Sequence, residues 1–178
     1  CNQNGRDDLN EVLRGESADC NRNSTPDECD VAPAVAFSGA RIFPVAHEPA
    51  AIAAGDWDLD GDLDLATANK GSSTVAVLVN LGRATFAPAV SYGVGSYPRD
   101  LRAADLAGDG APDLATADKL SDRATVLLND GTGRFGRQQL ELRAGRAPAG
   151  LALEDVNGDE RADVVVANRG SGDVSLFL

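Results

Sequence analysis

Short apolar runs separated by polar turns recur along most of this chain. Between residues 86 and 134 the runs lie at about 89–93, 100–104, 112–117 and 124–129. They alternate apolar with polar residues or are rich in β-branched residues, and Gly, Asn and Asp stand at the breaks. Such alternation predicts short β-strands joined by turns. The pattern therefore indicates four antiparallel strands in about 49 residues.

The same pattern occurs three times along the chain. "GDWDLDGDLDLATAN" (55–69) aligns with "ADLAGDGAPDLATAD" (104–118) and "EDVNGDERADVVVAN" (154–168), so the spacings are 49 and 50 residues. A proline stands seven residues before each aspartate-rich loop, and a phenylalanine about twenty residues before it. These landmarks are Pro49, Pro98 and Pro148, and Phe37, Phe86 and Phe135. Fixed periods of this length are typical of repeat architectures.

The repeat predicts the domain organisation and an all-β fold. Three repeats span residues 37–85, 86–134 and 135–178, and residues 1–36 lie outside the pattern. Four antiparallel strands per repeat are typical of a β-propeller blade, here with the aspartate-rich loop joining the second and third strands. A single blade cannot bury both of its faces, so we expect the blades to stack. Three blades are fewer than the about four to eight of a closed propeller.

The aspartate-rich loops carry oxygen ligands at alternate positions. Side chains at loop positions 1, 3, 5 and 9 project toward one point as the backbone curls, and position 7 offers its backbone carbonyl. Hard oxygen donors without His or Cys suit Ca²⁺ better than Mg²⁺ or Zn²⁺. The predicted ligands are Asp56, Asp58, Asp60, Asp62 and Asp64; Asp105, Asp109, Ala111 and Asp113; and Asp155, Asn157, Asp159, Arg161 and Asp163. The carbonyl ligands among them are those of Asp62, Ala111 and Arg161.

The three loops differ in completeness. The first has every ligand, the second has Ala107 at position 3, and the third has Glu160 at position 6, where the others have a turn glycine. We therefore expect calcium affinity to fall in the order first, third, second. The competing interpretation is an acidic turn without metal, because Asp favours turns. Three loops in one register favour the metal interpretation.

These repeats resemble FG-GAP repeats, also called VCBS-type repeats, of integrin α-subunit propellers and many bacterial surface proteins. Phe135-Gly136 keeps the literal "FG", and "RAP" (146–148) stands where that family has "GAP". The other two repeats keep the Phe and the Pro but not the glycine after Phe. The resemblance covers residues 37–178. It implies propeller blades with Ca²⁺ in the hairpin loop, in a family that serves adhesion and scaffolding more often than catalysis.

The N-terminal segment carries a second kind of predicted calcium loop. "DCNRNSTPDECD" (19–30) and "CNQNGRDDLNE" (1–11) share one register, and a short helix is expected over Asp8–Arg14. The predicted ligands are Asp19, Asn21, Asn23, Asp27 and Asp30, and Asn2, Asn4, Asp8 and Glu11. The segment resembles the tandem calcium loops of dockerins and thrombospondin type 3 repeats. A disordered acidic linker is the alternative interpretation.

All three cysteines lie in this segment and none in the repeats. That distribution indicates a disulfide in an oxidising, extracellular place. Cys1–Cys20 is the preferred pairing because both residues hold the same loop position, and Cys20–Cys29 is the alternative. Asn23 also lies in a glycosylation sequon, and its role as a calcium ligand is the favoured one.

Composition and charge narrow the function further. The net charge of −12 argues against nucleic acid and anionic membranes as partners, and no apolar stretch is long enough to span a bilayer. His47 is the only histidine, no nucleophile–base arrangement accompanies it, and we expect no enzyme. Trp57 is expected to pack between blades, with an exposed surface for sugar stacking as the alternative.

These features together predict an extracellular or cell-surface module stabilised by Ca²⁺, with a structural or adhesive role. We expect it to form a homo-oligomer or filament, or to join further blades of a longer chain. The alternative function is a ligand-binding propeller fragment that recognises protein or carbohydrate through loops on one face.

Overall fold

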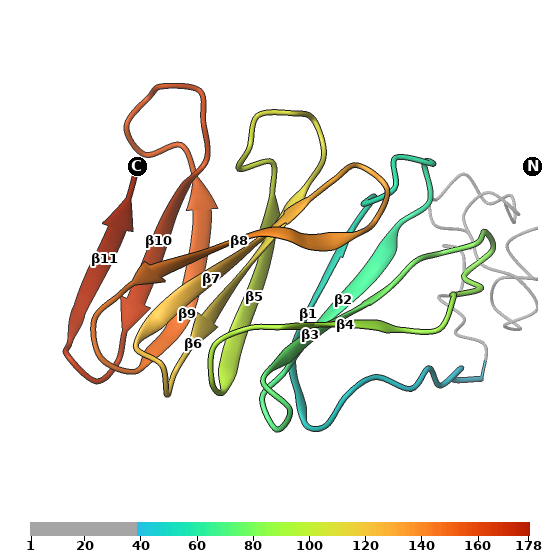
Figure 1. Ribbon diagram of the computed structural model, residues 1–178, viewed down its shortest axis with the longest axis horizontal. Coiled ribbons are helices and arrows are strands. Elements are labelled where there is room, and N and C mark those ends of the chain that lie inside the picture. Colours follow the sequence, from blue (N-terminus) through green and yellow to red (C-terminus); the bar gives the residue numbers. More distant parts are fainter. Residues whose placement is uncertain (1–38) are drawn as a thin grey trace, which may run out of the picture. The chain divides into compact units, whose positions relative to one another are not determined.

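Every regular element in the described residues is a β-strand (Figure 1). The computed structural model describes residues 39–178, so the predictions for residues 1–36 lie outside the described part of the chain. Within residues 39–178 no helix is long and apolar enough to cross a membrane. Phe43–Leu178 forms one compact unit. The all-β prediction is confirmed.

Eleven strands in this unit form three antiparallel sheets, which we call blades 1, 2 and 3. Blade 1 contains β1 (Pro49–Gly55), β2 (Asp64–Asn69), β3 (Thr74–Leu78) and β4 (Val90–Gly93), paired in that order. Blade 2 contains β5 (Pro98–Ala104), β6 (Asp113–Asp118), β7 (Arg123–Asn129) and β8 (Phe135–Arg143). Blade 3 contains β9 (Pro148–Glu154), β10 (Asp163–Asn168) and β11 (Asp173–Phe177).

The four strands expected between residues 86 and 134 all form, but they do not share one sheet. The first of them is β4, which pairs with β3 through Val77 and Val90 and so belongs to blade 1. The chain leaves blade 1 after β4, where Tyr97 adopts a left-handed φ of 62° directly before Pro98. This conformation turns the backbone out of its extended path. The last strand of each complete blade therefore comes from the following repeat, and blade 3 contains three strands instead of four.

The core lies between the blades, which stand side by side in chain order (Figure 1). Each blade has a leading face toward the preceding blade and a trailing face toward the next. Small residues dominate the trailing faces: Ala66, Ala68, Val75 and Val77 in blade 1, and Ala115, Ala117, Ala124 and Val126 in blade 2. Larger residues fill the leading faces: Leu101, Leu114, Leu127 and Phe135 in blade 2, and Leu151, Val164 and Val166 in blade 3. Alanine lets neighbouring sheets approach closely, and the expected stacking is confirmed.

Trp57 is the largest side chain in this core. It is fully buried, and its ring packs edge-on against Phe135 of blade 2 with centroids 6.2 Å apart. Phe135 also meets the ring of Tyr92 on β4 at 5.7 Å. The prediction that Trp57 packs between blades is therefore confirmed. Sugar stacking on this side chain is excluded because no part of it reaches the surface.

Candidate metal centre

The three aspartate-rich loops occupy the same place in every blade. They join β1 to β2, β5 to β6, and β9 to β10. The carboxylate at position 1 accepts hydrogen bonds from the backbone N–H groups four and five residues later, at 2.8–3.2 Å. The residues at position 1 are Asp56, Asp105 and Asp155. These bonds fold each loop around its first aspartate. In the third loop they also lower the pKa of Asp155, and the hydrogen bond from the Glu160 N–H contributes most to this shift.

The aspartate at position 9 is buried and fastens the loop to the rest of the blade. Asp64 accepts hydrogen bonds from the N–H of Trp57 at 2.9 Å and from the N–H of Asn80 at 2.7 Å. Asp113 accepts the equivalent bonds from Leu106 at 3.0 Å and Asn129 at 2.8 Å. Burial raises the pKa of Asp113, against the effect of these N–H donors. Asp163 accepts the N–H of Val156 at 3.0 Å.

Asn80 and Asn129 are structural residues whose role the sequence analysis did not anticipate. Asn80 lies two residues after β3, and Asn129 is the last residue of β7. Each contacts the aspartate-rich loop of its own blade. The Asn80 side chain donates to the Leu63 carbonyl at 3.0 Å, and that of Asn129 donates to the Pro112 carbonyl at 3.1 Å. The signal was present, because an asparagine ends both "TVAVLVN" and "ATVLLN" at the same repeat position.

Only the first loop gathers three acids among the described residues. Ligand atoms of Asp56, Asp58 and Asp64 all lie within 4.8 Å of one another. Asp58 Oδ1 is buried and accepts no hydrogen bond. Burial, followed by the negative charges of Asp64 and Asp60, raises the pKa of Asp58. A buried carboxylate oxygen without a donor is costly unless a cation neutralises it, so the residues present fit a Ca²⁺ ion.

The remaining predicted ligands are placed less favourably. Asp60 and Asp62 are exposed and lie outside the three-acid cluster, although Asp60 Oδ1 accepts the Asp62 N–H at 2.9 Å. In the second loop Ala107 leaves Asp105, Asp109 and Asp113 without the position-3 carboxylate. In the third loop the side-chain oxygen of Asn157 accepts the Asp159 N–H at 2.8 Å. Ala111 is buried and Arg161 is exposed.

Two positions in each loop adopt a left-handed backbone. Position 6 has φ values of 94° at Gly61, 89° at Gly110 and 67° at Glu160. The turn predicted at this position is therefore present in all three loops, even where the residue is not glycine. Position 4 is also left-handed, at Leu59, Gly108 and Gly158, which the sequence analysis did not predict.

Comparison with known protein families gives two overlapping matches. The description of the matching family is "FG-GAP-like repeat", and the matches cover residues 56–116 and 105–166. Both begin at position 1 of an aspartate-rich loop. Among curated proteins no match to the chain was found. Because the two matches together extend over residues 56–166 of the 178-residue chain, the chain belongs to the FG-GAP-like repeat family.

Proposed function

We propose that the chain is an extracellular, calcium-stabilised module with a structural or adhesive role in a larger assembly. FG-GAP-like repeats occur in extracellular adhesion and ligand-binding modules, are typically non-enzymatic, and are usually surface-exposed. The observation that carries the calcium part of the proposal is the buried, unpartnered Asp58 oxygen within the cluster with Asp56 and Asp64.

In this proposal the first loop holds Ca²⁺ most tightly. The three clustered carboxylates of this loop bind the ion directly; they belong to Asp56, Asp58 and Asp64. The Asp60 side chain and the Asp62 backbone carbonyl complete the oxygen shell. The third loop binds more weakly with Asn157 at position 3, and the second loop most weakly with Ala107. The ion would offset most of the negative charge of three carboxylates and would stabilise the attachment of the loop, through Asp64, to Asn80 just after β3.

The N-terminal segment extends the same proposal. Its two loops, of the kind found in dockerins and thrombospondin type 3 repeats, would add calcium sites and a disulfide outside the described residues. Homo-oligomers, or further blades on a longer chain, would provide the larger assembly. We also propose that the three repeats are of the VCBS type.

The test is the melting temperature of the chain against free Ca²⁺. Because the ion binds the folded state, saturation to 100 times the Kd should stabilise the protein by about 2.7 kcal/mol, or roughly 5–10 °C. Asp58→Ala should lose most of the shift that comes from the first loop. The same substitution should stabilise the protein in chelator, because it removes a carboxylate that lies close to the negative charges of Asp64 and Asp60 and has one buried oxygen without a donor. The variant should fold, since the second loop already has Ala107 at this position and keeps its hydrogen bonds.

Asp62→Ala is the matched control for the same loop. Its side chain is exposed and its predicted contribution is the backbone carbonyl, so the calcium shift should change far less than in Asp60→Ala or Asp58→Ala. A melting temperature that does not respond to Ca²⁺ overturns the calcium proposal. Equal losses for Asp62→Ala and Asp60→Ala overturn the assigned ligand register.

A further inference from the structure

The contact between successive blades occurs twice in this unit, and its two halves are exposed at opposite ends. Blade 2 packs its leading face on blade 1, and blade 3 packs its leading face on blade 2. In the described residues, no blade covers the leading face of blade 1 or the trailing face of blade 3. The repeat spacing allows each exposed residue to be compared with its buried counterparts.

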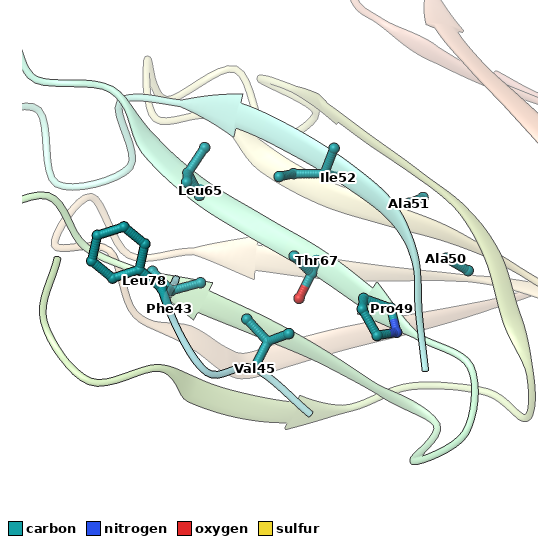
Figure 2. Close-up of a pocket in the computed structure, with 9 residues that line it drawn as sticks. All are labelled: Phe43, Val45, Pro49, Ala50, Ala51, Ile52, Leu65, Thr67 and Leu78. Atoms are coloured by element: carbon teal, nitrogen blue, oxygen red, sulfur yellow. The ribbon is translucent and has the colours of Figure 1, made fainter. Parts of the chain in front are cut away.

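Ile52 marks the exposed leading face. Its repeat equivalents, Leu101 and Leu151, are 0% and 8% exposed, whereas Ile52 is 62% exposed. Beside it lie Leu65 and Thr67, in a pocket of about 410 Å³ (Figure 2). Leu65 is half-buried, whereas its blade 2 equivalent, Leu114, is fully buried. This pocket is therefore placed where the trailing face of a preceding blade would lie.

Blade 3 presents the complementary trailing face. Val174 and Leu176 on β11 are 64% and 51% exposed, whereas their blade 1 equivalents, Val75 and Val77, are 0% and 2% exposed. Val156 is 53% exposed and stands at the loop position that Trp57 holds in blade 1. Val174 and Leu176 are bulkier than their blade 2 equivalents, Ala124 and Val126, and so are suited to a pocket that is open.

A strand position is also open at this end. β4 and β8 form the outer strands of blades 1 and 2, but within residues 39–178 no strand pairs with the outer edge of β11. By the 49-residue spacing, residues 41–44 correspond to β4, and Phe43 corresponds to Tyr92. The rings agree with this correspondence, because Phe43 meets Phe86 edge-on at 5.0 Å much as Tyr92 meets Phe135 at 5.7 Å.

We propose that a second copy of this chain completes blade 3. The trailing face of blade 3 in one copy packs on the leading face of blade 1 in the next, and the segment around Phe43 of that next copy adds to β11 as the fourth strand. Val156 of the first copy then lies against Phe86 of the second, as Trp57 lies against Phe135 within the chain. Such a contact is heterologous, so it extends head to tail.

A second copy is the favoured partner because the same interface already exists twice inside the chain. One exposed face, on blade 1, is the leading half of this interface, and the other, on blade 3, is the trailing half. This inference rests on the proposed function and names the partner and the surfaces of the assembly. It uses apolar faces and a strand edge instead of the calcium loop. The two ideas can therefore fail independently.

The experiment is sedimentation velocity of the full chain over a wide concentration range with saturating Ca²⁺. Species larger than the monomer should grow with concentration. Ile52→Asp and Val174→Asp should each weaken self-association by at least about 30-fold, because each places a charge in the centre of the interface. An equimolar mixture of the two variants should form a 1:1 dimer that does not grow, since one intact leading face meets one intact trailing face. Both side chains are exposed, so the fold should be retained, as circular dichroism would check.

Leu120→Asp is the matched control, because Leu120 is 67% exposed in the turn between β6 and β7, away from both faces. It should associate like the parent chain. A parent chain that remains monomeric at all concentrations, or association that persists in both face variants, overturns the proposal. Hydrogen exchange tests the strand addition separately. Amides of β11 should become protected on association, and unchanged exchange in an associated sample overturns that part.

The outcomes also separate this proposal from the calcium proposal. Absence of association together with a normal calcium-dependent rise in melting temperature overturns only the head-to-tail contact. Association with a melting temperature that ignores Ca²⁺ overturns only the calcium site.

Discussion

At the scale of single residues, Asp118 places a carboxylic acid at a repeat position where blades 1 and 3 have the amide side chains of Asn69 and Asn168. Its side chain is fully buried and accepts hydrogen bonds from Thr116 Oγ1 at 2.8 Å and Thr125 Oγ1 at 2.5 Å. Burial nevertheless raises the pKa of Asp118 from 3.8 to about 6, although the hydroxyl donors oppose it. Desolvation of the carboxylate therefore outweighs its hydrogen bonds.

Asp118 should make the free energy of unfolding depend on pH. Because its folded pKa is raised, its stabilising contribution is complete below pH 3.8 and is lost as the pH rises through about 6. The loss amounts to about 3 kcal/mol. In urea unfolding, the free energy of unfolding of Asp118→Asn should rise by about this amount, relative to that of the parent chain, between pH 4 and pH 7. The reciprocal Asn69→Asp, at an equally buried site, should acquire a pH dependence of the same sign. A parent–variant difference that stays constant with pH would contradict the pKa assignment.

At the scale of elements, the strands and loops followed from the sequence because local patterns determine them. Alternating apolar residues predicted the strands, and the repeated aspartates predicted hairpin loops with a sharp turn at position 6. The assignment of β4 to blade 1 did not follow, because it depends on pairing with β3 and on the left-handed Tyr97. The cross-strand bonds from Asn80 and Asn129 to the loop aspartates were missed for the same reason. Such contacts join residues that are 16 positions apart.

The third loop shows how backbone conformation and ligand chemistry can be varied separately. Glu160 has a φ of 67° and donates its N–H to Asp155 at 2.8 Å, a bond that glycine would keep. Glu160→Gly should therefore stabilise the folded chain by about 0.5–1 kcal/mol, because an L-residue is strained in this region. Thermal unfolding in chelator measures the effect without metal.

In the second loop, Gly110→Ala should destabilise the folded chain by a similar amount. No atom lies within 4 Å of the added Cβ, so the effect comes from the left-handed backbone and not from a steric clash. Stabilisation by Gly110→Ala would refute the backbone explanation.

At the scale of the whole molecule, the blades depend on one another. Blade 2 buries apolar side chains on both faces, in one core shared with blade 1 and another shared with blade 3. Separating blade 2 from either neighbour would expose one of these cores to water. Blades 1–3 should therefore unfold cooperatively, with the packing of Trp57 on Phe135 as the central contact between blades 1 and 2.

Trp57 allows that cooperativity to be measured, because it is the only tryptophan in the chain and lies wholly within the interface. In urea unfolding of the parent chain, tryptophan fluorescence should coincide with far-ultraviolet circular dichroism, since loss of the interface unfolds the blades together. Trp57→Ala should lower the free energy of unfolding by about 3–5 kcal/mol, through lost burial and the cavity left against Phe135. Leu63→Ala, in the same loop but 62% exposed, should change it by less than about 0.5 kcal/mol. If the fluorescence transition of the parent came well before the loss of β-structure, the blades would be independent and the shared core would not hold them together.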